Sequence, residues 1–204
     1  MGLKLESKCV RCRRLNTKLF LKGERCLTNK CALERRRVPV ISERRMSQYA
    51  RQLREKQKLR FKYGVTETQF RRYYERAEKM KGITGEELLR LLERRLDNVI
   101  FRLGFCASRA QARQLVVHGH FMVNDRKVKS PSYLVKEGDV IELNKRSRKL
   151  EVIKQNLQSS SGRAVPAWLE RDDKLLKGKV LRFPEREELD QEVDVSLIVE
   201  YYSR

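Results

Sequence analysis

The stretch from Arg94 to Val128 reads RRLDNVIFRLGFCASRAQARQLVVHGHFMVNDRKV and decides the fold that we expect. A first helix should end at Gly104, Ser108 should begin a second one, and Gly119 should end it, because serine caps helix starts and glycine suits helix ends. Alternation with a period of two from Phe121 onward indicates a strand. The sequence therefore predicts two short helices side by side, followed by a hairpin.

The two predicted helices carry arginines beside their apolar residues, so one face can pack while another offers guanidinium groups to phosphate. These arginines are Arg94, Arg95, Arg102, Arg109 and Arg113. We expect all but Arg102 to bind RNA, together with Gln114, His118, His120 and Asn124. The two histidines have no carboxylate or thiolate beside them in sequence, so an RNA contact or a structural role is favoured over metal binding or catalysis.

Three capping-box patterns predict further helix starts: Thr66 with Gln69, Thr84 with Glu87, and Ser108 with Gln111. The stretch from Ser47 to Tyr63 contains no Gly or Pro and stops at Gly64, which predicts one helix. A second helix should run from Thr66 towards Gly82, and a third should run from Thr84 without a break to Leu103.

The first of these helices carries a basic stripe of Arg51, Arg54, Lys58 and Lys62, spaced by three, four and four residues. A solvated helix face is the alternative, but like charges along one stripe repel unless something screens them, so phosphate is favoured. We also expect Arg71 and Arg72, on the following helix, to contact RNA.

Four cysteines near the start of the chain, Cys9, Cys12, Cys26 and Cys31, are separated by two, thirteen and four residues. This spacing favours one tetrahedral zinc ion held by a knuckle. A disulfide framework and redox chemistry are the alternatives; the absence of a secretion signal and of a thioredoxin-like pattern disfavours them. The segment has few apolar residues, so the metal should be structural.

Basic residues surround these cysteines, and their positive field should favour the thiolate forms that zinc requires. They are Lys8, Arg11, Arg13, Arg14, Lys18, Lys22, Arg25 and Lys30. From this region and the basic connector that follows, we expect RNA contacts from Arg11, Arg13, Arg14, Lys22, Arg35 and Arg36.

Beyond the hairpin, a Gly-Asp turn followed by a strand up to Leu143 predicts a small mixed or antiparallel sheet. A helix from Leu150 to Leu157, a polar linker and a strand at Val180–Phe183 should follow. The apolar run Val195–Tyr202 should dock on the body. Residues 185–192 form an acidic patch that would be solvated or meet a basic neighbouring protein.

The charge of the whole chain favours nucleic acid as the partner: 48 Lys and Arg against 27 Asp and Glu give a net charge of +21. We expect no membrane-spanning segment, signal peptide or small-molecule substrate, and therefore a cytosolic protein. No catalytic residues are predicted, because no nucleophile–histidine–acid order, phosphate-binding glycine loop or carboxylate pair stands out.

We therefore predict an α+β protein with a mainly helical N-terminal region, a four-cysteine zinc knuckle, and an RNA-binding module of paired helices with a small sheet. The predicted parts are the knuckle and connector at 1–45, a helical part at 46–93, the module at 94–157 and a C-terminal segment at 158–204 that packs back on the body.

Several motifs resemble the bacterial ribosomal protein S-four family over nearly the whole chain. They are LREKQKLR from Leu53, RLDNV from Arg95, SRAQARQLV from Ser108, and His118-Gly-His120 with Val123-Asn124. The four cysteines are similar to those of the zinc-containing branch. The residues from Glu34 to Arg45 stand where many members carry a segment rich in Gly, Pro and His.

This resemblance implies a structural protein of the small ribosomal subunit that binds the 5′ domain of its ribosomal RNA early in assembly. It also implies contact with ribosomal protein S-five and with other small-subunit proteins, and an influence on translational accuracy. The alternative is a translational repressor that binds messenger RNA, its own included, or a free RNA chaperone that uses the same surface.

Overall fold

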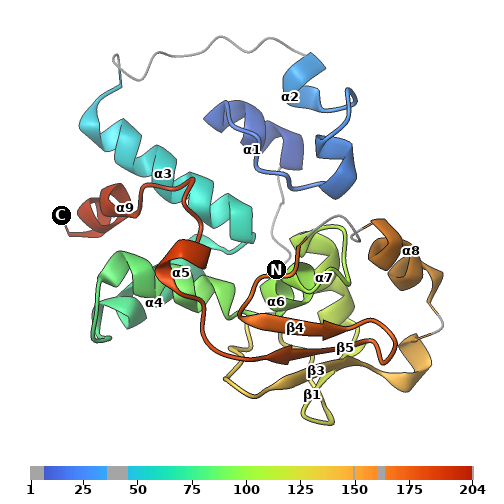
Figure 1. Ribbon diagram of the computed structural model, residues 1–204. Helices are drawn as coiled ribbons and strands as arrows, with labels where there is room; N and C mark the ends of the chain where they lie inside the picture. The colour runs from blue at the N-terminus through green and yellow to red at the C-terminus, as the bar shows by residue number, and fades with distance from the viewer. Residues whose placement is uncertain (1–6, 36–45, 149, 160–163, 204) are drawn as a thin grey trace. The chain divides into compact units, whose positions relative to one another are not determined.

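The computed structural model describes residues 7–35, 46–148, 150–159 and 164–203. The chain divides into two compact units, Met1–Gly85 with Gln191–Arg204, and Glu86–Asp190 (Figure 1). The first is helical and the second combines helices with a sheet, so the α+β class is confirmed. The predicted C-terminal segment at 158–204 is divided between the two units. No helix within the described ranges is long and apolar enough to cross a membrane.

The first unit contains short helical turns around the cysteines and longer helices after them. The elements are α1 (Lys8–Leu15), η1 (Gly23–Cys26), α2 (Ala32–Arg35), α3 (Gln48–Tyr63), α4 (Glu67–Glu78), the start of α5 (Thr84–Glu93) and α9 (Val195–Tyr202). The Ser47 hydroxyl accepts a hydrogen bond from the Ala50 amide at 3.2 Å, and Gly64 ends α3 with φ of +65°. Both ends of α3 are therefore fixed by residues that the sequence singles out.

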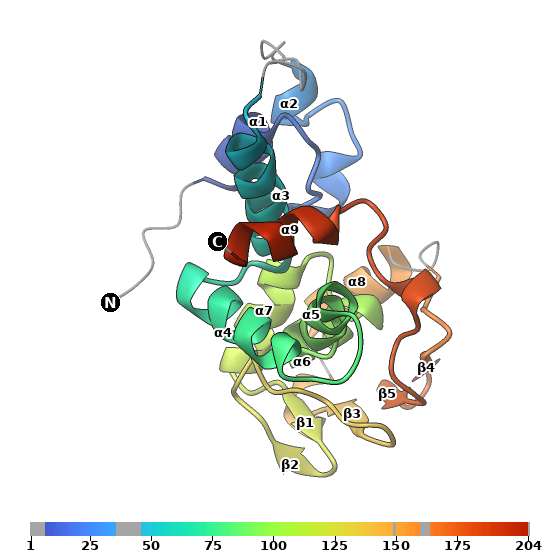
Figure 2. The same cartoon turned by 90° about the vertical axis from the view of Figure 1, so that its left-hand side faces the viewer.

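The C-terminal helix α9 lies across α3, as Figure 2 shows. Ile198 is fully buried, and the Tyr202 ring stacks on Tyr74 with 4.6 Å between ring centroids. The Tyr202 hydroxyl donates a hydrogen bond to the Glu67 carboxylate at 2.9 Å, and Lys56 donates to the same carboxylate at 2.7 Å. Apolar packing and a small polar network thus hold the last helix.

The second unit is built on a five-stranded sheet in the order β2-β1-β3-β5-β4, with every pair antiparallel. The strands are β1 (Phe121–Val123), β2 (Arg126–Lys127), β3 (Val140–Leu143), β4 (Leu169–Asp172) and β5 (Lys177–Val180). The sheet predicted after the hairpin is confirmed, but the strand predicted at Val180–Phe183 ends at Val180. Strand β5 has the mostly polar sequence KGKV, which does not itself favour a strand. Its pairing with β3 and β4 makes this segment a strand.

Helices α6 (Leu96–Arg102) and α7 (Arg109–Val117) pack side by side on one face of this sheet (Figure 1). With α8 (Glu151–Ser159), they enclose a core that includes Phe105, Phe121 and Trp168, each at most 1% exposed. Short helical turns, η3 (Lys145–Ser147) and η4 (Arg186–Glu188), complete the unit. Cys106 is fully buried in this core, and burial raises the pKa of its thiol, as expected for a small apolar residue.

The helix predicted to run unbroken from Thr84 to Leu103 is two helices, which corrects the sequence-based expectation. α5 ends at Glu93 and α6 begins at Leu96, because Arg95 is extended and forms a β-bridge with Leu134. The Leu96 amide donates a hydrogen bond to the Tyr133 carbonyl at 2.8 Å. Hydrogen bonds to a segment distant in sequence replace the helical ones at this point, and local propensity does not reveal them.

Candidate nucleic-acid interface

Arg95 is buried and is part of the fold rather than of an RNA surface. Its side chain is 1% exposed, and its Nε and Nη2 donate to the two carboxylate oxygens of Asp97 at 3.0 and 2.7 Å. This two-point pairing consumes the guanidinium edge that phosphate would use. This geometry gives Arg95 a structural role and argues against the prediction that it binds RNA.

A buried carboxylate, Glu93, organises the neighbouring polar groups. It accepts hydrogen bonds from Arg102 Nε and Nη2, at 3.0 and 2.6 Å, and from Asn98 Nδ2 at 2.7 Å. The side-chain oxygen of Asn98, Oδ1, in turn accepts from Arg109 Nε at 2.7 Å, and the Arg109 guanidinium lies over the Phe101 ring. These contacts fix the guanidinium groups of both arginines. Nothing in the sequence predicts the roles of Glu93 and Asn98, because only the burial of their side chains distinguishes them.

Arg94 is also held inside the second unit. Its Nε donates to the Val135 carbonyl at 3.1 Å, and its guanidinium lies 4.0 Å from the centroid of the Phe183 ring. The structure therefore gives Arg94 a packing role that the sequence-based analysis did not anticipate.

Asn124 shapes the β1–β2 turn. Its Nδ2 donates to Asp139 at 2.8 Å, its Oδ1 accepts from the Val140 amide at 2.9 Å, and its φ is +48°. Its side-chain amide is thus engaged by the chain itself, although Asn124 is exposed. The predicted Asn124–Asp125 turn is confirmed, since both residues adopt positive φ.

The end of α7 and the hairpin together offer a polar and basic surface in the second unit. Gln114 and His118 are exposed there and Arg113 is half-buried, whereas His120 Nδ1 lies 2.9 Å from the Ser147 hydroxyl. Burial, aided by the charges of His118 and Lys127, lowers the pKa of His120 and so favours its neutral form.

Hairpin cations join this surface, and the sequence-based analysis missed them. They are Arg126, Lys127 and Lys129, all exposed. A Cβ at Gly119 would lie 2.2 Å from Lys127 Cε, so Lys127 crosses the end of α7 beside His118. The polar residues of the returning strand β2 were the feature of the sequence that could have indicated these exposed cations. We define the hairpin surface as Arg113, Gln114, His118, Arg126, Lys127 and Lys129.

The basic stripe predicted on α3 is largely occupied by the chain itself. Arg54 Nη2 donates to the Leu15 carbonyl at 2.7 Å, Lys58 donates to the Glu192 carbonyl, and Lys62 pairs with the Glu192 carboxylate at 2.8 Å. The Lys58 and Lys62 side chains are only 15% and 14% exposed. Backbone carbonyls and the Glu192 carboxylate therefore engage three of the four stripe residues within the chain.

Arg51 is the exposed member of that stripe, and its Nε donates to the Met46 carbonyl at 3.4 Å. Another residue of the acidic patch, Glu188, pairs with Arg182 at 2.6 Å. Glu188 and Glu192 of the acidic patch thus form ion pairs within the chain, while Glu185 and Glu187 are exposed, as expected for a solvated face.

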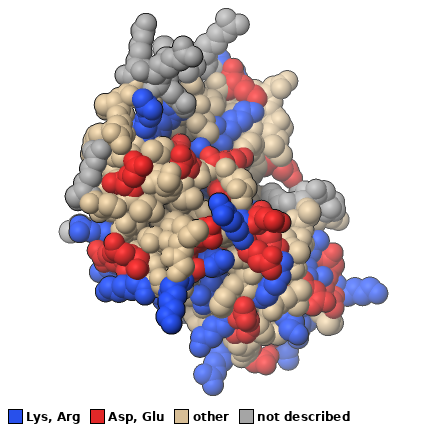
Figure 3. All heavy atoms as spheres, turned by 60° about the vertical axis from the view of Figure 1, so that its left-hand side comes forward, with Lys and Arg blue, Asp and Glu red and all other residues tan. Residues whose placement is uncertain are grey.

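Other predicted cations of the first unit are accessible. Arg14, Lys22, Arg35, Arg71 and Arg72 are exposed, whereas Arg13 is half-buried and Arg11 lies over the Phe61 ring. Arg71 pairs with Glu75 at 3.1 Å, and Arg36 lies outside the described residues. Exposed cations that were not predicted as RNA contacts are Arg25, Lys30, Arg76, Lys79 and Lys81. On the face drawn in Figure 3, acidic side chains are interspersed among the basic ones.

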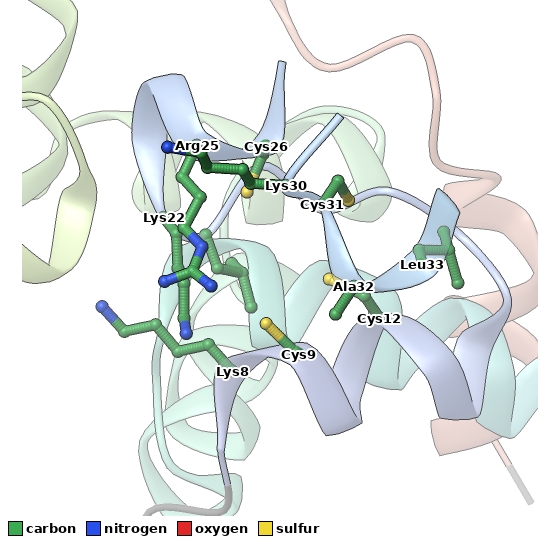
Figure 4. Close-up of a pocket in the computed structure, with 11 residues that line it drawn as sticks. Lys8, Cys9, Cys12, Lys22, Arg25, Cys26, Lys30, Cys31, Ala32 and Leu33 are labelled. Atoms are coloured by element: carbon green, nitrogen blue, oxygen red, sulfur yellow. The ribbon is translucent and has the colours of Figure 1, made fainter. Parts of the chain in front are cut away.

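The four predicted metal ligands line one cavity of about 20 Å³, with Lys8, Lys22, Arg25 and Lys30 also in its lining. In Figure 4, Cys9 and Cys12 from α1 point into the same space as Cys26 from η1 and Cys31 from just before α2. All five cysteines of the chain are free thiols. The cavity is of the order of one water molecule or one ion in size.

At one of these thiols, Cys12, burial outweighs the positive surroundings. Burial, together with the charges of Cys26, Cys9 and Cys31, raises the pKa of Cys12 despite a backbone hydrogen bond from Leu19. Within the described ranges, no group of three or more His, Cys, Asp or Glu side chains is arranged to hold a metal ion as it stands. The donor set suits zinc, and mutual repulsion of the thiolates is what a dication would relieve.

Comparison with known proteins covers almost the entire chain. Residues 4–93 match the family model described as the ribosomal protein S4/S9 N-terminal domain, and residues 94–141 match the S4 domain. A small ribosomal subunit protein uS4 from Thermodesulfovibrio yellowstonii is 54% identical over 202 residues, 97% of each chain. The uS4 protein from Thermus thermophilus is 53% identical over 209 residues and the full length of both chains. The chain therefore belongs to the ribosomal protein S-four (uS4) family.

Proposed function

We propose that this protein is a structural constituent of the small ribosomal subunit that binds ribosomal RNA, and that it is found in ribosomes of the cytoplasm. The observation that carries the proposal is the identity of more than half of its residues with uS4 proteins along their whole length. The net charge of +21 supports a polyanionic partner. The protein has no proposed catalytic role.

Binding should proceed through phosphate neutralisation and recognition of RNA shape. The hairpin surface and the exposed cations Lys22, Arg35 and Arg72 supply the positive charge. Each phosphate that is neutralised contributes about 0.7 to 0.9 to the negative slope of log affinity against log salt concentration. Filter binding of the full chain to small-subunit ribosomal RNA should show a steep slope.

Two charge reversals locate the surface. Arg126→Glu with Lys127→Glu should weaken ribosomal RNA binding and reduce the salt slope, because both side chains are exposed on the hairpin surface. Lys174→Glu with Lys179→Glu, a pair of exposed lysines away from that surface in sequence, is the matched control. A flat salt response in the wild-type protein, or equal losses in both pairs, would contradict the proposal.

We further propose that the target is the 5′ domain of the ribosomal RNA, bound early in assembly, and that ribosomal protein S-five is a neighbour that shares an effect on accuracy. Family resemblance supports these finer assignments. Competition between RNA fragments for the purified protein tests the first, since the 5′ domain should match the affinity of full-length RNA. Cross-linking within intact subunits tests the second.

The alternative is a repressor of its own messenger RNA or a free RNA chaperone, and an exposed basic surface would serve either. Sedimentation of cell lysate separates these cases. A structural ribosomal protein co-migrates with small subunits in stoichiometric amount, whereas a repressor or chaperone remains mainly in the unbound fractions.

We also propose that Cys9, Cys12, Cys26 and Cys31 hold one structural zinc ion. Their shared cavity and all-thiol donor set support this, as does the shortage of apolar residues in the segment. Metal analysis of protein purified without added metal should give about one equivalent. Cys12→Ala should lose the metal, and Cys106→Ala, which changes the cysteine outside the cavity, should retain it. Retention of a full equivalent in Cys12→Ala would contradict the assignment.

A further inference from the structure

A groove of about 700 Å³ lies between α1 and α3 in the first unit. Apolar side chains, including Leu15, Leu53 and Phe61, form much of its wall. Its volume falls within the range of about 300 to 1,000 Å³ that is typical of sites for small organic molecules. Cys9 and Cys12 occupy a different face of α1, so the groove is separate from the proposed zinc site.

The groove is strongly basic. Among the described residues that line it are four arginines, Arg11, Arg14, Arg54 and Arg60. The one lining carboxylate, Glu67, pairs with Arg60 Nη1 at 3.3 Å and also accepts hydrogen bonds from Lys56 and Tyr202. Arg54 Nη2 donates to the Leu15 carbonyl, so the arginines are held in place and their remaining N–H groups outnumber the acceptors in the groove wall. An anionic ligand therefore complements the groove, and guanidinium groups bind phosphate with well-defined geometry.

The groove also has features that suit a planar base. The guanidinium groups of Arg11 and Arg60 each lie 4.8 Å from the centroid of the Phe61 ring, which orients their planes. Unstacked RNA bases bind on guanidinium planes and aromatic rings of this kind. An apolar wall next to oriented guanidinium planes accommodates a base better than it accommodates an isolated phosphate ion.

Gln57 and Arg60, which line the groove, each bury a polar side-chain atom. Gln57 Oε1 and Arg60 Nε are buried and have no hydrogen-bond partner within the part of the chain that the structure describes. They are one acceptor and one donor, three residues apart on α3. If the Gln57 and Arg60 side chains turn toward a bound ligand, a base edge can satisfy both atoms because it carries donors and acceptors, whereas a phosphate group supplies acceptors alone.

We propose that this groove binds one unpaired nucleotide of RNA, with its base between the apolar wall and the oriented guanidinium groups and its phosphate on the arginines. The inference rests on the proposed ribosomal RNA binding and adds a specific site to it. It would make α1 a helix with two roles, since its cysteines and its groove residues lie on different faces.

Two variants of the full chain test the groove. Leu53→Trp fills it while keeping the four arginines, and Gln57→Ala removes the unsatisfied acceptor. We expect Leu53→Trp to weaken ribosomal RNA binding by about fivefold or more, the loss of one stacked base. Gln57→Ala should weaken binding by about threefold, the loss of one hydrogen bond. Gln69→Ala is the matched control, because Gln69 Oε1 is also buried without a partner in the described residues but does not line the groove.

Affinity and thermal unfolding should be measured on the same samples. Weaker binding by both groove variants with unchanged unfolding, and wild-type binding by Gln69→Ala, would support the site. Wild-type affinity in both groove variants would overturn this inference while leaving the proposed function intact. Failure of the wild-type protein to bind ribosomal RNA would instead overturn the proposed function.

Free ligands separate a nucleotide site from a simple anion site. In NMR titrations of the full chain, ribonucleoside 5′-monophosphates should shift amide signals near Gln57 on α3. Inorganic phosphate at the same concentration should not reproduce those shifts. Identical shifts with phosphate alone would overturn the nucleotide assignment.

Discussion

Replacing Arg95 by methionine would strand a buried charge. Arg95 and Asp97 are 1% and 4% exposed at their side chains and are joined by two hydrogen bonds of 3.0 and 2.7 Å. Arg95→Met leaves the Asp97 carboxylate without its counterion in the interior. Removing one partner of such a pair costs about 3 to 5 kcal/mol in the free energy of unfolding.

The cost should appear as a lower melting temperature of the second unit. For a unit of about 100 residues, 1 kcal/mol corresponds to about 4 °C, so a fall of about 12 to 20 °C is expected. Replacing both partners, as in Arg95→Met with Asp97→Leu, removes the stranded charge. The double variant should recover at least half of the lost stability, because an apolar pair of similar size avoids the cost of burying ions.

Differential scanning calorimetry measures the melting temperature, and filter binding below the transition measures the affinity for ribosomal RNA. Folded Arg95→Met should keep the wild-type affinity and salt slope. Arg126→Met, on the exposed hairpin surface, should show the reverse pattern of normal stability and weaker binding. Normal stability of Arg95→Met together with a smaller salt slope would refute the structural role and restore Arg95 as a phosphate ligand.

Three other effects follow from particular contacts. In Gly178→Ala the new Cβ would lie 2.4 Å from Leu103 Cδ1. We expect this overpacking to lower the free energy of unfolding, measured by thermal unfolding, by about 1 to 3 kcal/mol. Unchanged stability would contradict the close approach. Tyr202→Phe removes the 2.9 Å hydrogen bond to Glu67 and should cost about 1 kcal/mol in urea unfolding; no change would show that water replaces it. Burial alone would raise the pKa of the Glu67 carboxyl, but hydrogen bonds from Lys56 and Tyr202 lower it below 4.5. The carboxylate therefore stabilises the fold above that pH, and this stabilisation is lost as the pH falls through the pKa of the folded state. The free energies of unfolding of the wild-type protein and of Glu67→Gln, measured as the pH is lowered, should converge at low pH. Parallel curves would refute the stabilising role of the Glu67 carboxylate.

Local interactions made much of the fold predictable. The hydroxyls of Thr66 and Ser108 accept hydrogen bonds from amides three residues later, at 3.2 and 3.3 Å, as the capping boxes predict. The third box differs, because α5 begins at Thr84 itself and Glu87 pairs with Arg90. Caps and turns involve groups within a few residues of one another, so the sequence displays them directly.

The candidate RNA surface was less predictable, because a basic side chain has the same appearance in the sequence whether it is exposed or paired. Lys62 is neutralised by Glu192, 130 residues away, whereas Lys127 is exposed on the hairpin. Counting charges therefore indicated the class of partner but did not separate structural cations from accessible ones.

The sequence by itself determined the helix boundaries set by caps, the hairpin turn, the basic character and the family. Tertiary structure decided that Arg95 interrupts a helix to pair with Asp97, that α9 packs on α3, and that four arginines line one groove. The physical reason is distance along the chain. Capping bonds span three or four residues, whereas burial and ion pairing depend on which remote segments the folded chain brings together.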